Sequence, residues 1–183
     1  MEDYVYILDY FPQGSSLAKR ESVCYAVGES EFKLFELVPK KGVTINLEDK
    51  VYVGKNPNLR NEIDRVRRRI DYSNLTNTAI VTLEYVLKNI ITQDQKRFIK
   101  FYNESQPVGQ KKHMLEELPG LGKKMMSDIL TARSAGIFKD FEDLRSRVPT
   151  VKDPIKLIVK RILQELSENN LRRYIFVVRN ERQ

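Results

Sequence analysis

The residues best suited to chemistry lie in one short run: Leu118-Pro119-Gly120-Leu121-Gly122-Lys123-Lys124. Pro119 ends a short predicted helical segment, and the two glycines permit a tight turn with positive φ and no Cβ in front of the backbone. The apolar spacing that follows predicts a second helix, which begins at once. Backbone N–H groups at a helix N-terminus, beside two glycines and two lysines, favour an anion, most often a phosphate.

Residues 115–130 closely resemble a helix-hairpin-helix motif, in which a Pro-Gly-x-Gly hairpin holds a nucleic-acid backbone without reading the bases. The resemblance implies a nucleic-acid-binding site formed by Gly120, Leu121, Gly122, Lys123 and Lys124. An ordinary helical turn with glycine caps is the alternative. The run is not a dinucleotide fingerprint, because no strand precedes it and no third glycine follows.

The pattern repeats 30 residues later, at Val148-Pro149. Thr150 and Lys152 replace the two glycines, so this backbone is less able to approach a phosphate. The second copy is therefore predicted to be mainly structural. Lys152 and Lys156 begin a basic stripe on the following helix, which is either a further nucleic-acid contact or a solvated face.

The densest basic cluster consists of Arg65, Arg67, Arg68 and Arg69. Two interpretations stay open. The cluster is a second nucleic-acid contact through Arg65, Arg68 and Arg69, or it is a helix face paired with Glu62 and Asp64.

No signature of a serine, cysteine or metal enzyme is present. His113 is the only histidine and is predicted to be exposed or a helix cap rather than a phosphate contact. Cys24 is the only cysteine and is predicted to lie in the core. Asp140, Glu142 and Asp143 are better suited to capping a helix than to holding Mg²⁺. We expect no catalytic residues, no metal and no cofactor.

The net charge of +7 is unevenly distributed along the chain. Residues 1–106 carry 16 Lys and Arg against 15 Asp and Glu, whereas residues 107–183 carry 16 against 10. A basic half beside a neutral half predicts a polyanionic partner, with a surface rich in ion pairs as the alternative. No apolar run approaches the roughly 20 residues that cross a bilayer, and the acidic N-terminus is unlike a signal peptide. We expect a cytoplasmic protein with no membrane partner.

The elements that position these residues are predicted to form an α+β protein. Residues 1–72 are expected to form a small β-barrel, because short strands with two open edges are costly. Apolar spacing favours a helix over residues 56–70, with a strand as the alternative. Residues 73–106 are predicted to be a helical connector, and residues 107–170 an all-α tandem helix-hairpin-helix domain. Residues 173–179 are predicted to return as a strand of the N-terminal sheet, because a lone strand is unstable.

Short motifs along the whole chain also carry a family resemblance: residues 4–10, 68–72 with Leu75-Thr76, 97–103, His113 before residues 115–120, and residues 161–163. They resemble an uncharacterised archaeal family of proposed RNA-binding proteins, a domain of unknown function. The resemblance implies that the barrel is oligonucleotide-binding-like (OB-like) and joined to the tandem hairpins. It also favours RNA over DNA as the partner.

These observations predict a non-enzymatic nucleic-acid-binding protein that holds the phosphate backbone largely independently of sequence. Two alternatives remain open: a protein–protein scaffold in a nucleic-acid machine, and a nucleic-acid-processing enzyme with an unrecognised site.

Overall fold

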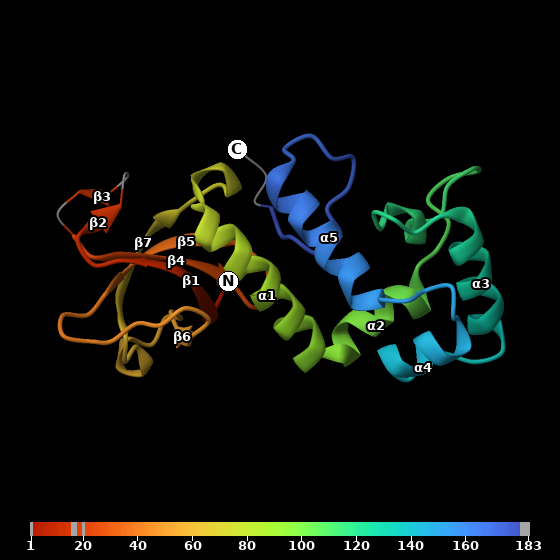
Figure 1. Cartoon of the computed structure of the whole chain (residues 1–183), viewed down its shortest axis with the longest axis horizontal. Coiled ribbons are helices and arrows are strands. Elements are labelled where there is room, and N and C mark those ends of the chain that lie inside the picture. The colour runs from red at the N-terminus through yellow and green to blue at the C-terminus, as the bar shows by residue number, and fades with distance from the viewer. Residues whose placement is uncertain (1, 16–17, 20, 180–183) are drawn as a thin grey trace. The chain divides into compact units, whose positions relative to one another are not determined.

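The computed structural model describes residues 2–15, 18–19 and 21–179 (Figure 1). The chain divides into two compact units. The sheet unit contains the residues up to Val86 together with those from Gln164 onward. The helical unit is Leu87–Leu163. Among the described residues, no helix combines the length and the apolar character needed to cross a membrane.

The sheet unit is built on five antiparallel strands: β1 (Tyr4–Phe11), β4 (Val23–Gly28), β5 (Leu34–Pro39), β6 (Lys50–Tyr52) and β7 (Ile63–Arg69). Their order is β6-β1-β4-β5-β7, and two further short strands, β2 (Gly14–Ser15) and β3 (Ala18–Lys19), pair with each other. Within the described residues β6 and β7 do not pair, so the curled sheet remains an open half-barrel. The prediction of a closed OB-like barrel is therefore wrong. The open edge is tolerated because β7 is lined with exposed charged side chains, which discourage strand addition.

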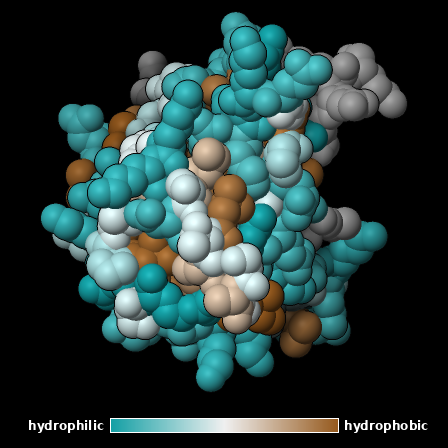
Figure 2. Space-filling model, turned by 90° about the vertical axis from the view of Figure 1, so that its right-hand side faces the viewer, coloured by the Kyte–Doolittle hydropathy of each residue, from teal (hydrophilic) through white to brown (hydrophobic). Residues whose placement is uncertain are grey.

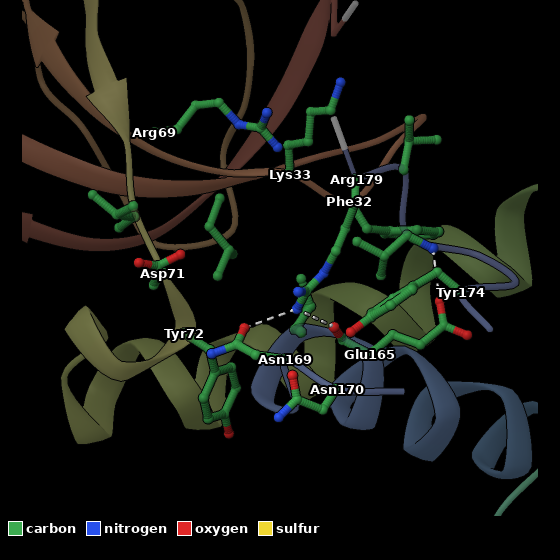
Figure 3. Close-up of a pocket in the computed structure, with 15 residues that line it drawn as sticks. Phe32, Lys33, Arg69, Asp71, Tyr72, Glu165, Asn169, Asn170, Tyr174 and Arg179 are labelled. Carbon is green, nitrogen blue, oxygen red and sulfur yellow. Dashed lines mark hydrogen bonds between the residues drawn. The ribbon is translucent and has the colours of Figure 1, made fainter. Parts of the chain in front are cut away.

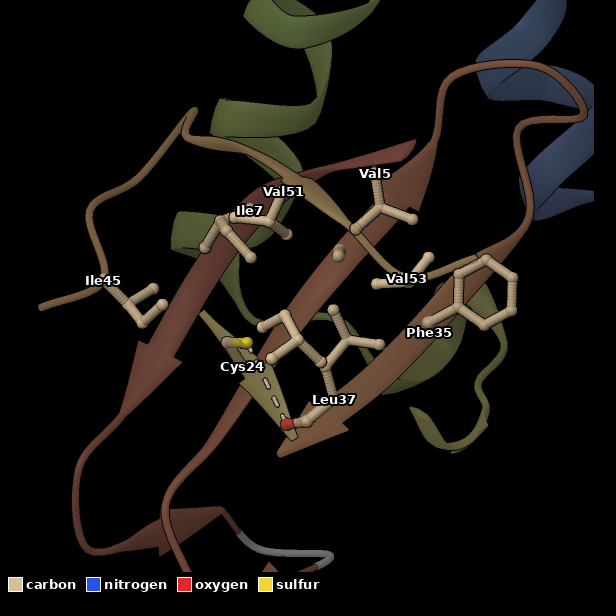
Figure 4. Packing of buried hydrophobic residues seen from close by; sticks show 10 residues of the cluster. Val5, Ile7, Cys24, Phe35, Leu37, Ile45, Val51 and Val53 are labelled. Atoms are coloured by element: carbon tan, nitrogen blue, oxygen red, sulfur yellow. Dashed lines mark hydrogen bonds between the residues drawn. The ribbon is translucent and has the colours of Figure 1, made fainter. Parts of the chain in front are cut away.

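The two central strands, β4 and β5, are buried along their whole length. Their apolar and β-branched side chains fill one face of the sheet together with Val5 and Ile7 of β1 (Figure 4). Cys24 belongs to this cluster, as predicted, and its thiol lies 3.9 Å from the Leu37 carbonyl oxygen. On the opposite face Tyr25 is equally buried. This core holds the positions of β5 and β7, whose ends form a cavity described below.

The helix favoured over residues 56–70 is not present. A short 3₁₀ helix, η1 (Pro57–Leu59), is followed by strand β7. The apolar spacing was misleading because its members are not on one buried face: Ile63 is buried, whereas Leu59 and Val66 are 53% and 37% exposed. The strand, which was the alternative interpretation, is the element that forms.

Residues 72–104 form a 3₁₀ turn and two helices: η2 (Tyr72–Asn74), α1 (Asn77–Gln93) and α2 (Gln95–Glu104). Before α1, the Thr76 hydroxyl donates a hydrogen bond to Asp9 of β1. Asp94 separates the helices and caps α2, because its carboxylate accepts from the Arg97 backbone N–H.

The remaining elements of the helical unit are η3 (Met114–Glu117), α3 (Lys123–Ser134), α4 (Phe141–Arg147) and α5 (Pro154–Ser167), of which α5 continues into the sheet unit. Tyr102 of α2 is fully buried, and its hydroxyl donates to the Pro154 carbonyl oxygen at 2.7 Å. A separate all-α tandem helix-hairpin-helix domain is not evident, which corrects the prediction. The element before Pro119 is a single 3₁₀ turn, and the compact unit reaches back to Leu87 rather than beginning at residue 107.

The C-terminal segment does not form the predicted strand over residues 173–179. The carboxylate of Glu165 instead accepts three consecutive backbone N–H groups, those of Ile175, Phe176 and Val177, at 2.8–3.0 Å. A side chain of α5 thus supplies the acceptors that a neighbouring strand would have supplied. One sheet-like bond remains, from the Val178 N–H to the Glu31 carbonyl oxygen.

Candidate nucleic-acid interface

The turn at residues 118–122 is closed by its own backbone. The Leu118 N–H donates to the Leu115 carbonyl, and the Leu121 N–H donates to the Leu118 carbonyl. Gly120 has φ +93°, which a side chain would oppose, so glycine is required there. Gly122 differs from the prediction, because its φ of −85° and ψ of 174° are extended values open to any residue. Glycine at this position provides space rather than a special conformation.

The N-terminus of α3 is open. A Cβ placed on Gly122 would meet no heavy atom within 4 Å. The backbone N–H groups of Gly122, Lys123, Lys124 and Met125 have no acceptor in the part of the chain that the structure describes. Both lysines are exposed and form no ion pair with a described residue. Four free donors and two cations at a positive helix end are an arrangement suited to a phosphate oxygen.

Arg161 of α5 holds the base of this turn. Its side chain is only 4% exposed, and its Nη1 donates to the Glu117 carbonyl oxygen at 3.1 Å. The same nitrogen lies 3.4 Å from the Glu117 carboxylate, which also pairs with Lys112 at 2.8 Å. Arg161 therefore braces the turn from inside and is not available to a ligand.

His113 caps η3 rather than contacting solvent. Its Nδ1 accepts the Leu115 N–H at 3.1 Å, while its own backbone N–H donates to Glu116 at 2.7 Å. Burial lowers the pKa of His113, and the nearby Arg133 lowers it further. A neutral ring is what an acceptor cap requires, and of the two predicted roles the cap is the one observed.

The second turn has the same internal bond, from the Val151 N–H to the Val148 carbonyl at 2.9 Å. Its helix end is occupied, because Asp153 accepts the Lys156 N–H at 2.9 Å. Thr150 donates to Asp128 of α3 at 2.8 Å, which joins the second turn to the helix that follows the first. The two turns therefore differ in structure: the helix N-terminus after the second turn is capped by Asp153, whereas the N-terminus of α3 is open.

Lys152 and Lys156 are exposed beside this occupied helix end and form no ion pair with a described residue. They lie in the helical unit with Lys123 and Lys124. Figure 2 looks onto the side of Figure 1 that carries α3 and α4, and shows mainly hydrophilic side chains around a central hydrophobic strip.

The acidic trio at the start of α4 is structural, as predicted. Asp140 accepts the Asp143 N–H at 2.8 Å, and Asp143 accepts the Lys139 N–H at 3.0 Å. Asp143 also pairs with Arg147, and these contacts lower its pKa, with the Lys139 N–H contributing most. In the described ranges no group of three or more His, Cys, Asp or Glu residues could hold a metal ion.

The arginine cluster lies in the sheet unit, on β7, and most of it is neutralised. Arg65 pairs with Glu21 and Asp64 at 2.5 and 2.8 Å. A bulge in β7 lets both Arg67 and Arg68 reach the buried carboxylate of Glu36, at 3.4 and 3.3 Å. The alternative of paired charges is therefore close to what the structure shows, although on a strand. Arg69 is the member of the cluster without an ion pair to a described residue.

Sequence reasoning missed several buried charges, among them Glu36, Arg161 and Glu165. Each falls at a position where the surrounding apolar pattern predicts a core residue. A charge in such a position is costly unless a partner neutralises it, so it signals a buried contact even before that partner is known.

Comparison with other proteins agrees with this fold. The family described as "Protein of unknown function (DUF655)" matches residues 1–178. Uncharacterized protein MJ0038 of the archaeon Methanocaldococcus jannaschii is 39% identical over 178 residues, covering 97% of this chain and 80% of that protein. The crystal structure of Af1531 from Archaeoglobus fulgidus, assigned to the same family, is 38% identical, covers 97% of this chain and 100% of its own, and matches with a TM-score of 0.90. The open sheet followed by helices is thus shared with a solved structure, and the chain belongs to the DUF655 family.

Proposed function

We propose that this protein binds nucleic acid through the phosphate backbone at the N-terminus of α3, largely independently of base sequence and without catalysing a reaction. The observation that carries the proposal is the row of unbonded N–H donors from Gly122 to Met125, beside the exposed Lys123 and Lys124. With no Cβ on Gly122, a phosphate oxygen can approach these donors closely.

The use of the two basic residue types supports this proposal. Arg133, Arg147 and Arg161 donate to backbone carbonyls inside the helical unit. Lysines, by contrast, remain exposed beside both turns. These exposed lysines form no ion pair with a described residue and so remain available to a polyanion.

Contacts with the phosphate backbone can form with either RNA or DNA. We favour RNA because of the sequence resemblance given above. The same resemblance and the basic character of the helical unit favour this proposal over a protein–protein scaffold. A scaffold would not need free backbone N–H groups for binding a phosphate.

The proposal is tested by titrating the full chain with a structured RNA, a single-stranded DNA and a duplex DNA at several salt concentrations. With three to five phosphate contacts, log K should fall linearly with log salt with a slope of roughly −2 to −4. Fluorescence anisotropy of labelled oligonucleotides gives these constants. Absence of binding at low salt, or an affinity that does not change with salt, would favour the scaffold alternative.

Lysine variants locate the contact. Lys123→Ala and Lys124→Ala should each weaken binding and reduce the magnitude of the salt slope by about one. Lys100→Ala on α2 is the matched control, because it removes the same charge from an exposed lysine of the same unit. If all three variants lose affinity equally, only net charge matters and the site at α3 is wrong.

A further inference from the structure

The sheet unit contains a cavity of about 700 Å³ that the nucleic-acid proposal does not use. It lies among the ends of β5 and β7, the turn η2, the C-terminal end of α5 and the segment held by Glu165. Its size is that of a site for a small organic molecule rather than for a single inorganic ion. Buried Phe32 and Leu34 contribute apolar lining.

One wall offers a cation. Arg69 is exposed, lines the cavity and has no ion pair or side-chain hydrogen bond with a described residue. Its neighbours Arg67 and Arg68 both pair with Glu36. Within the arginine cluster, Arg69 is therefore the guanidinium that remains available to a ligand. A guanidinium presents paired donors that match the oxygens of a phosphate. Figure 3 shows Arg69 and Lys33 on the strand side of the cavity.

The same wall carries Asp71, two residues after Arg69, with Tyr72 next to it (Figure 3). A carboxylate beside a phosphate-binding arginine is suited to accepting the hydroxyls of a ribose. The tyrosine contributes a ring on which a base can stack.

The opposite wall presents amides. Asn169 and Asn170 follow α5, and Figure 3 places both on the helix side of the cavity. The Asn169 oxygen holds Arg179 at 3.1 Å, while Arg179 lies 4.3 Å from the centroid of the Tyr174 ring. The Asn170 amide has no partner among the described residues and offers both a donor and an acceptor, as the edge of a base requires.

We infer that this cavity binds a nucleoside monophosphate unit, with the phosphate at Arg69, the ribose at Asp71 and the base between Tyr72 and the amides of Asn169 and Asn170. The unit is either a free nucleotide or an unpaired nucleotide of a nucleic-acid chain. The inference stands on the sheet unit alone and does not require the site at α3.

The test is isothermal titration calorimetry of the full chain with AMP, GMP, CMP and UMP, with dAMP, adenosine and inorganic phosphate as comparisons. We expect saturable binding of at least one ribonucleotide, and at least tenfold weaker binding of adenosine and of phosphate. AMP should bind more tightly than dAMP, and equal affinities would overturn the assignment of Asp71 to the ribose. A 5′-phosphorylated tetranucleotide distinguishes the sources: tighter binding than AMP indicates a nucleic-acid chain, and weaker binding indicates the free nucleotide.

Variants of the residues that line the cavity test the site directly. Arg69→Ala should weaken nucleotide binding at least tenfold, and Asn170→Ala should weaken it while leaving the fold intact. Arg65→Ala is the matched control on the same strand, because Arg65 does not line the cavity. No saturable binding at millimolar nucleotide, or equal binding by the Arg69→Ala and Arg65→Ala variants, would overturn the inference. Gly122→Val should bind mononucleotides like the parent protein, so failure of one site is distinguishable from failure of the other.

Discussion

At the scale of single residues, arginines and lysines have different roles in the helical unit. Arginines such as Arg147 bind several carbonyl oxygens at once, at 2.6–3.2 Å, because the guanidinium presents several fixed donors. The lysines at the N-termini of α3 and α5 have a single compact charge and stay exposed. Counting basic residues in the sequence therefore overestimates the surface available to a polyanion, and the overestimate is largest for Arg65–Arg69.

Gly122→Val tests the open helix end at α3. The extended backbone at this position accepts a valine, so the cost in stability should be about 1 kcal/mol, that of a poor N-cap. A Cβ near the free donors should nevertheless weaken nucleic-acid binding about tenfold, since a charge-assisted hydrogen bond contributes about 1.5–3 kcal/mol. Anisotropy titrations and thermal melts measure the two effects.

Thr150→Val is the paired variant at the second turn. It removes the hydrogen bond to Asp128 and should cost about 1 kcal/mol of stability, with little change in binding. If it reduces binding while Gly122→Val does not, the assignment of the binding turn is reversed.

Cys24 predicts a specific pH dependence of stability. Burial raises the pKa of its thiol to about 12, against a reference value of 9.0. The folded protein therefore keeps a proton that the unfolded chain loses, so this contribution is complete below about pH 9 and is lost as pH rises toward 12, by about 1.4 kcal/mol per pH unit. Urea unfolding at about pH 8 and about pH 10.5 should show a steeper loss for the parent than for Cys24→Ser. Parallel losses would contradict the buried thiol.

The burial of Cys24 and the capping by Asp140 were predictable, because both depend on neighbours within a few residues. The partners of Arg161 and Glu165 were not. Arg161 reaches Glu117, 44 positions away, and such a pairing leaves no local pattern in one sequence.

At the scale of elements, the C-terminal segment shows how one side chain can replace a strand. The two oxygens of Glu165 accept three consecutive N–H groups, whereas one neighbouring strand would pair only every second residue. The apolar run at residues 174–178 correctly indicated a segment that needs a partner. It could not indicate that this partner is a helix side chain, so the predicted strand was wrong.

Glu165→Gln should release this segment. One amide oxygen cannot accept all three bonds, and a buried N–H such as that of Val177 costs about 1–3 kcal/mol when it is left unpaired. Chemical denaturation should show the loss, and hydrogen exchange should show faster exchange at Ile175, Phe176 and Val177. Glu168→Gln is the control, because Glu168 is exposed one residue after the end of α5. Unchanged exchange at the three amides would show that the segment is held by packing alone.

The predicted helix over residues 56–70 failed for a different reason. Its apolar positions fit a helical period, but a period is informative only when its members share a buried face. In addition, the bulge that brings Arg67 and Arg68 to one carboxylate interrupts the two-residue alternation of side chains by which a strand is recognised in a sequence.

At the scale of the whole molecule, the sequence correctly indicates an α+β chain whose first part is rich in strands. Whether that sheet closes was not predictable, because pairing between its edge strands, β6 and β7, depends on how strongly the whole sheet curls, which no local pattern encodes. The predicted helical domain failed similarly: a repeated motif is a local property, whereas a domain is defined by the contacts around it.

Truncation after Asn170 should lower the melting temperature of the sheet unit. It removes the buried Val177, the bond from Val178 to Glu31, and the three N–H groups that donate to the Glu165 carboxylate. Glu165→Leu should destabilise the full chain but recover part of the loss in the truncated one. This non-additivity is measured by thermal melts of the four proteins. Additive losses would show that Glu165 and the segment act independently.

The open edge of the sheet has a consequence for self-association. β7 is paired only with β5 in the described residues, so its outer backbone groups remain a template for another chain. Charged side chains are the barrier to such templating, and polyanions that screen them would lower it. A chain in which apolar residues replace the charges on β7 should therefore be prone to edge-to-edge pairing between copies.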